Sequence, residues 1–180
     1  MDKTAIEHWS PVIGGQFWWT GLIFVLIFVP LMIFFGNKIS SKQRDVVLYG
    51  MGIYQLGNKA LTQIGYIFSD NYIMASNLPL HLCGLSGILA GIVVFYRKQI
   101  LFEFLYFFGL VGFIHSVLTP EFTGGVSNWK IFDYYVGHSM LIIIPVWLMK
   151  YYEFRLRHNA WWTSFIYLQL IVVLVSQANS

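Results

Sequence analysis

The amino-acid sequence predicts an all-α membrane protein in which six transmembrane helices form one bundle. Of its 180 residues, 57% are hydrophobic and only 11% are charged, whereas a soluble domain carries about 25% charged residues. So few charges cannot cover a surface that faces water. Apolar runs of about 20 residues, the length that crosses a bilayer, alternate with short polar segments. Aromatic residues often stand where the two meet, as they do at membrane interfaces.

The apolar runs leave no room for a soluble domain, so we predict a single transmembrane domain over residues 1–180. The first run is led by Trp18 and Trp19 and ends at Gly36. The third begins at Pro79, which suits the first turn of a helix. The predicted spans are residues 16–35, 46–68, 79–96, 100–118, 132–149 and 161–175.

The basic residues predict the orientation of the bundle. Cytoplasmic loops are enriched in Lys and Arg, and eight of the eleven Lys and Arg residues follow spans one, three and five. We therefore expect both termini, and the start of the third span, on the non-cytoplasmic side. The eight residues are Lys38, Lys42, Arg44, Arg97, Lys98, Lys150, Arg155 and Arg157.

The same distribution predicts which partners the protein has. Its basic residues lie between apolar runs, so we expect no nucleic acid. The expected partners are the lipid bilayer and a membrane lipid or lysolipid substrate, and the expected location is a bacterial cytoplasmic membrane. The single cysteine rules out a disulfide within the chain.

Three histidines are predicted at one depth beneath the non-cytoplasmic face. His81 opens the third span, His115 lies near the outer end of the fourth, and His138 lies in the outer third of the fifth. Cys83 is level with them, and Tyr134 stands one turn before His138. Ionisable groups in membrane helices usually face the bundle interior and mark functional sites. The alternative is that each histidine caps a helix end or bonds to a neighbouring helix.

The second span carries a polar face formed by Gln55, Asn58, Lys59 and Gln63, whose spacing is helical. A lysine at the centre of a membrane helix costs about 2.5–3.5 kcal/mol, so Lys59 requires a partner or water. The face either lines a polar cavity that receives a lipid headgroup or another anion, or forms a hydrogen-bonded seam between helices. The sequence favours neither.

Cys83 is a candidate nucleophile because the thiolate form reacts and a nearby histidine promotes it. His81 is only two residues away and points to a different side of the helix. His138 or His115, on other helices, is better placed to serve as its base. The alternative is that Cys83 is a small buried apolar residue.

Three segments together resemble the YwaF-like integral membrane proteins. They are Leu-Pro-Leu-His-Leu-Cys at the third span, Phe-Phe-Gly-Leu-Val-Gly followed by His-Ser-Val-Leu-Thr-Pro-Glu in the fourth, and Tyr-Tyr-Val-Gly-His in the fifth. The resemblance covers about residues 46–150. That family includes a eukaryotic transmembrane acyltransferase of ether phospholipids. The resemblance implies a catalytic membrane cysteine and a later histidine, which match Cys83 and His138 by order and spacing.

The first functional hypothesis is therefore a lipid acyltransferase that needs no cofactor. Cys83 would form a thioester, and His138 would act as its base. Tyr134 or Asp133 could orient His138, while His115 or backbone amides could stabilise the oxyanion. His81 is the remaining residue that we expect to support this catalytic site.

Two other functions fit the same residues. His81, His115 and His138 could bind zinc in a membrane hydrolase, since three histidines and a water form a catalytic zinc site. A non-enzymatic transporter, channel or assembly protein would instead use Lys59 and its polar face to line a path.

Overall fold

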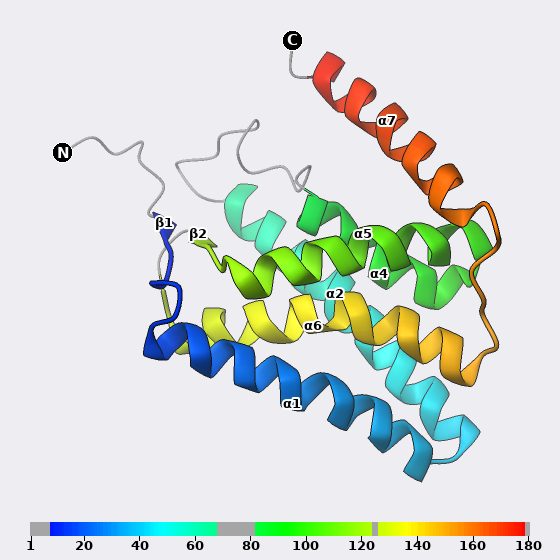
Figure 1. Ribbon diagram of the computed structural model, residues 1–180, viewed down its shortest axis with the longest axis horizontal. Coiled ribbons are helices and arrows are strands. Elements are labelled where there is room, and N and C mark those ends of the chain that lie inside the picture. Colours follow the sequence, from blue (N-terminus) through cyan, green and yellow to red (C-terminus); the bar gives the residue numbers. More distant parts are fainter. Residues whose placement is uncertain (1–7, 68–81, 124–125, 179–180) are drawn as a thin grey trace.

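In the computed structural model of the protein, each of the six predicted spans contains a helix, and successive helices run in opposite directions (Figure 1). The structure describes residues 8–67, 82–123 and 126–178. The helices are α1 (Gln16–Lys38), α2 (Ser41–Ile67), α4 (Leu82–Tyr96), α5 (Gln99–Leu118), α6 (Asn128–Tyr151) and α7 (Ala160–Ala178).

The all-α prediction missed one small element. Two-residue strands β1 (His8–Trp9) and β2 (Phe122–Thr123) pair antiparallel, with Trp9 opposite Phe122. The rings of Trp9 and Phe122 lie 5.5 Å apart, and Phe17 of α1 packs against both. This aromatic cluster joins the start of α1 to the segment between α5 and α6.

The sequence predicts six membrane spans, but fewer of the described helices are long and apolar enough to cross a membrane. Among the described residues, only α1, α5 and α6 are long and apolar enough to cross a membrane. The apolar stretch of α4, Gly84–Tyr96, is shorter, and residues 79–81 of the predicted third span lie outside the described part. The polar face of α2 keeps its mean hydropathy low. The side of the membrane on which each terminus lies stays a prediction.

Hydrogen bonds at the helix ends explain where α2 and α6 begin. The side chain of Gln43 accepts from the backbone N–H of Ser40, and the Gln43 N–H donates back to the Ser40 hydroxyl, which forms a capping box. Ser127 caps α6 by accepting from the backbone N–H of Lys130. After α6, Glu153 adopts a φ of 60° and turns the chain away.

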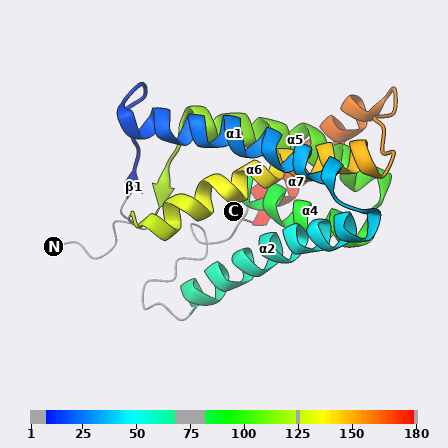
Figure 2. The ribbon, with the colours of Figure 1, turned by 90° about the horizontal axis from the view of Figure 1, so that it is seen from below.

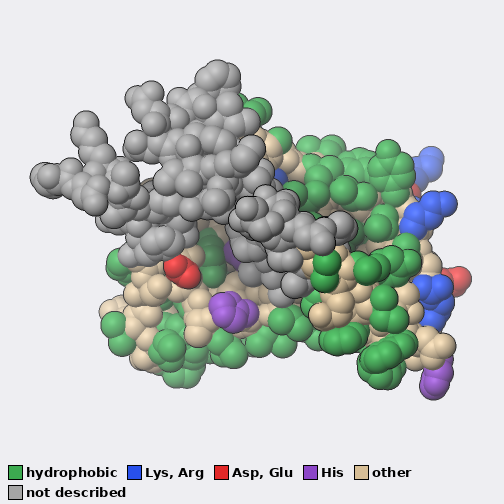
Figure 3. Space-filling model, turned by 90° about the horizontal axis from the view of Figure 1, so that it is seen from above, with side chains coloured by type: hydrophobic (Ala, Val, Ile, Leu, Met, Phe, Trp, Pro, Cys, Tyr) green, Lys and Arg blue, Asp and Glu red, His purple; other side chains and the backbone are tan. Residues whose placement is uncertain are grey.

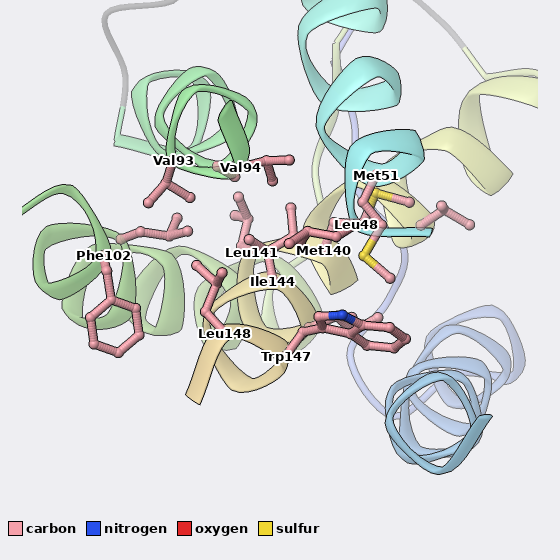
Figure 4. Close-up of a cluster of buried hydrophobic side chains, with 14 residues drawn as sticks. Leu48, Met51, Val93, Val94, Phe102, Met140, Leu141, Ile144, Trp147 and Leu148 are labelled. Carbon is pink, nitrogen blue, oxygen red and sulfur yellow. The ribbon is translucent and has the colours of Figure 1, made fainter. Parts of the chain in front are cut away.

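Helix α6 lies at the centre of the bundle and contacts α1, α2, α4 and α5; Figure 2 shows it between α1 and α2. Its apolar residues from Val136 to Leu148 form half of one buried cluster, with partners from α2, α4 and α5 (Figure 4). Trp147, Ile143 and Ile144 are fully buried. The middle of the bundle is therefore apolar from helix to helix.

Glycines allow the closest helix contacts, as is common in membrane bundles. A Cβ added at Gly109 of α5 would lie 2.7 Å from the backbone carbonyl oxygen of Leu141 in α6. A Cβ added at Gly91 of α4 would lie 2.4 Å from the Leu56 side chain in α2. Only a residue without a side chain fits at these two crossings.

Helix α7 packs against α5 near its own start and then diverges from the bundle (Figure 1). Beneath it lies a partly open cavity of about 380 Å³. The cavity is lined by Leu85, Leu89, Ile100, Leu101, Phe104 and Tyr167. Hydrophobic side chains also cover much of this face of the molecule (Figure 3).

The predicted basic loops meet at one end of the bundle, where Lys and Arg side chains gather (Figure 3). Arg97, between α4 and α5, forms an ion pair of 3.1 Å with Asp45 of α2. The Tyr152 hydroxyl donates to the same carboxylate at 2.7 Å. These two contacts hold the pKa of Asp45 below its usual range, the tyrosine having the larger effect. Burial, with the Asp45 hydrogen bond, raises the pKa of Tyr152 to about 12.

A second contact at this end fixes the loop before α7. The side chain of Glu103 is 1% exposed and accepts two charged hydrogen bonds from Arg157, at 2.9 Å from Nε and 2.6 Å from Nη2. The backbone N–H of Arg157 and the amide of Gln99 also donate to it. A buried carboxylate is stable only when it is paired and hydrogen-bonded in this way.

We expect Gly109→Ala to lower the free energy of unfolding by about 1–3 kcal/mol, the usual cost of overpacking, because the new methyl group would meet backbone that cannot move aside. Thermal unfolding in detergent micelles measures the change. Gly57→Ala is the matched control, since an added Cβ meets no described atom within 4 Å there. Equal unfolding temperatures for the two variants would contradict this account of the α5–α6 crossing.

We expect Arg157→Gln to cost about 3 kcal/mol of stability, because it leaves a buried carboxylate without its charged partner. Adding Glu103→Gln should restore much of the loss, since the unpaired charge is then gone. Lys98→Gln removes an exposed positive charge at the same end and serves as the control. Chemical denaturation of the wild type, Arg157→Gln, Glu103→Gln and the double variant measures the coupling, and additive effects would show that the pair is not coupled.

Candidate functional site

The polar residues of α2 and α6 meet in a seam at the end of the bundle away from the basic loops. Asp133 of α6 accepts two hydrogen bonds from the Asn58 amide, at 2.6 and 2.7 Å. The Tyr54 hydroxyl also donates to Asp133. Each carboxylate oxygen thus has a donor from α2, which is what a charge in a low-dielectric seam requires.

Gln55 and Lys59 extend this seam toward α4. The Gln55 amide is 2% exposed and donates to the backbone carbonyl of Gly137 at 2.8 Å. Lys59 lies against Gly87 of α4, where an added Cβ would be 2.8 Å from its Cε atom. Gln63, the fourth residue of the predicted polar face, is half-buried. For Gln55 and Asn58 the face is an interhelical seam, and the polar cavity stays a prediction.

His138 is held by its own helix. Its Nδ1 atom lies 2.7 Å from the backbone carbonyl oxygen of Tyr134, and the two rings are 4.2 Å apart. A carbonyl can only accept, so Nδ1 carries the proton and Nε2 is the acceptor nitrogen of the neutral ring. The Tyr134 hydroxyl donates in turn to the carbonyl of Ser116 in α5 at 3.1 Å.

Of the two residues expected to orient His138, Tyr134 contacts it through its backbone carbonyl and its ring. Asp133 bonds to α2 instead. His115, expected to stabilise an oxyanion, is exposed on α5 near the Thr119 hydroxyl, 3.5 Å from its Nε2 atom.

Gln55 fixes the relative heights of α4 and α6. It bonds to Gly137, and its Oε1 atom lies 3.8 Å from where a Cβ of Gly87 would stand. Both α4 and α6 run antiparallel to α2, so they are parallel to each other and Gly87 is level with Gly137. Counting back four residues places position 83 level with Asp133. The side chain of Cys83 and the whole of His81 lie outside what the structure describes.

The zinc hypothesis also depends partly on His81. Among the residues that the structure describes, no three His, Cys, Asp or Glu side chains are close enough to hold a metal ion. The set that we predicted, His81, His115 and His138, therefore stays a prediction.

The TMEM164 family, a family of transmembrane proteins, matches the chain over residues 7–180. The chain belongs to the TMEM164 family. No curated protein and no solved structure matches it. Membership supports a membrane protein, in agreement with the three span-length helices of this TMEM164-family chain. The closer resemblance to YwaF-like proteins stays a prediction.

Sequence reasoning missed two residues of the seam in this TMEM164-family protein. Tyr54 lies one turn before Asn58 on the same face of α2, so the helical spacing of that face could have included it. Gly87 lies one turn after Cys83, but a single glycine in an apolar run carries no signal of a lysine opposite. Both become visible only when α2 is packed against its neighbours.

We expect Asn58→Ala to lower the free energy of unfolding by about 1.5–3 kcal/mol, the value of hydrogen bonds to a charged group, because Asp133 loses two donors. Thr62→Ala, an exposed site one turn along α2, is the matched control and should change stability little. Denaturation in micelles compares them. Full stability of Asn58→Ala would show that the seam does not hold α2 to α6.

Proposed function

We propose that the protein is a membrane-embedded lipid acyltransferase that uses Cys83 as nucleophile and His138 as general base, near the non-cytoplasmic face. The observation that carries the proposal is that the His138 ring leans back along α6 toward the height of position 83. Position 83 of α4 is level with Asp133 of α6 through the contacts of Gln55. His138 is five residues further along α6, about 7.5 Å at 1.5 Å per residue, and its ring leans back toward that level, to the Tyr134 carbonyl.

The face of α4 also supports the proposal. Residues 83, 87 and 90 follow one another at helical spacing, and Gly87 and Ala90 are both buried. Gly87 meets Lys59 of α2, and Ala90 belongs to the core formed with α6. Position 83 therefore lies on the side of α4 that faces the bundle interior.

The histidine tautomer suits a general base. With the proton on Nδ1 held by a carbonyl, Nε2 is the nitrogen that accepts a proton from a thiol. The hydrogen bond also keeps the ring from rotating. A base that is already oriented loses little freedom when the substrate arrives.

In the proposed reaction, Nε2 of His138 takes the Cys83 thiol proton while the sulfur attacks the acyl ester carbonyl of a donor phospholipid. The carbon–oxygen bond breaks, the thioester forms, and His138 returns the proton to the departing lysolipid oxygen. The hydroxyl of an acceptor lysolipid then gives its proton to His138 and attacks the thioester. The sulfur leaves as a thiolate and recovers that proton, so the enzyme is unchanged.

We expect Cys83→Ala to abolish acyl transfer between phospholipid and lysophospholipid in proteoliposomes, and His138→Gln to slow it by about 10²–10⁴-fold, the usual contribution of a general base. His158→Gln is the matched control, because His158 lies in the loop at the basic end. Mass spectrometry of the wild type after a short reaction should find an acyl group on Cys83.

Full activity of Cys83→Ala, with no acyl adduct at any time, would contradict the thioester mechanism. Elemental analysis separates the zinc alternative. One zinc per chain, with activity lost on chelation and kept in Cys83→Ala, would favour a His-ligated hydrolase.

A further inference from the structure

A second cavity lies between α1 and α6, at the end of the bundle where β1 and β2 pair. Its volume is about 250 Å³, and it is partly open. Nothing in the proposed transfer reaction uses it. It is lined by Phe17, Thr20, Gly21, Phe24, Asn128, Ile131, Phe132 and Tyr135.

Tyr135 gives this cavity a chemical preference. The residue is 4% exposed, and its hydroxyl has no hydrogen-bond partner among the described residues. Leaving a buried hydroxyl without a partner is costly, and native structures rarely do so without water or a ligand. The unmet group is a donor, so the missing partner is an acceptor oxygen.

Gly21 keeps that hydroxyl within reach of the cavity. A Cβ at this position would lie 2.1 Å from the Tyr135 hydroxyl oxygen, so α1 presents only backbone there. Thr20 already donates its hydroxyl proton to the carbonyl of Gln16 and offers only an acceptor. Tyr135 is therefore the donor on this wall that lacks an acceptor.

The rest of the lining is mostly hydrocarbon. Phe17, Phe24, Ile131 and Phe132 surround the Tyr135 hydroxyl, and Asn128 and Thr20 are the other polar residues of the lining. A trapped water needs two to four polar partners. An occupant with a long apolar body and one acceptor oxygen satisfies the lining better than water does. The occupant must also reach the cavity from the bilayer, because α1 and α6 are both span-length helices.

The depth of the cavity agrees with such an occupant. Gly21 is five residues into α1, or about 7 Å from its start at 1.5 Å per residue. The polar headgroup and interfacial regions add about 5–7 Å to each side of the hydrocarbon core. We infer that this cavity binds the acyl-ester segment of a glycerolipid, with an ester carbonyl accepting from the Tyr135 hydroxyl.

The test compares a diacyl phosphatidylcholine with its dialkyl ether analogue, which has the same chains and headgroup but no ester carbonyl. Binding to the detergent-solubilised protein is measured by native mass spectrometry. A Cys83→Ala background prevents the proposed transfer from consuming the ester, so the two ideas fail separately. We expect the diacyl lipid to bind about tenfold more tightly, the effect of one hydrogen bond.

Tyr135→Phe keeps the ring over Gly21 and should remove the preference for the ester while leaving the unfolding temperature nearly unchanged. Tyr167→Phe, a partly exposed tyrosine on α7, should keep the preference. Equal binding of the two lipids to the parent protein, or an ester preference that persists in Tyr135→Phe, would overturn the inference.

Discussion

The hydrogen-bonded carboxylate of Asp133 is the constraint on which the half of the bundle away from the basic loops depends. A charge between membrane helices is stable only if its oxygens have donors, and here Tyr54 and Asn58 supply them from α2. Because these donors must face Asp133, only one rotation of α2 about its own axis and one position of α2 along α6 satisfy them. A shift of α2 by one residue would turn its donors away and leave the charge uncompensated.

The height of α4 then follows from α2 rather than from α6 directly. Gly91 and Gly87 are contacted by side chains of α2, including Lys59, so α4 is placed on a helix that Asp133 has already positioned. The apolar cluster around Trp147 and Ile144 separates this seam from the basic end. A continuous polar path would need to cross that cluster, so the packing favours a site at one face over a path for ions or solutes.

The sequence predicts the helices well and their partners poorly. The lengths of the hydrophobic runs located the six helices, because each run is visible within its own segment of sequence. The hydrogen bond between Asp133 and Tyr54 joins two helices, so the sequence did not reveal it. The sequence showed only the spacing of Asp133 and His138 along one helix. Polar content explains why α2 is not among the span-length helices, since it carries interhelical donors that lower its hydropathy without removing it from the bundle. The Trp9–Phe122 strand pair is too short to leave an alternating pattern.

The partner of His138 matters for the chemistry that we propose. A carboxylate beside the imidazole would stabilise the protonated ring and would also put a second charge into a low-dielectric site. The Tyr134 carbonyl fixes the same tautomer without adding charge. In the proposed reaction, a thiolate and an imidazolium formed before the ester carbonyl is in place would be costly, because a low-dielectric site stabilises separated charges poorly. Proton transfer would then accompany attack, and the free thiol would be protected from reaction until a lipid substrate is bound.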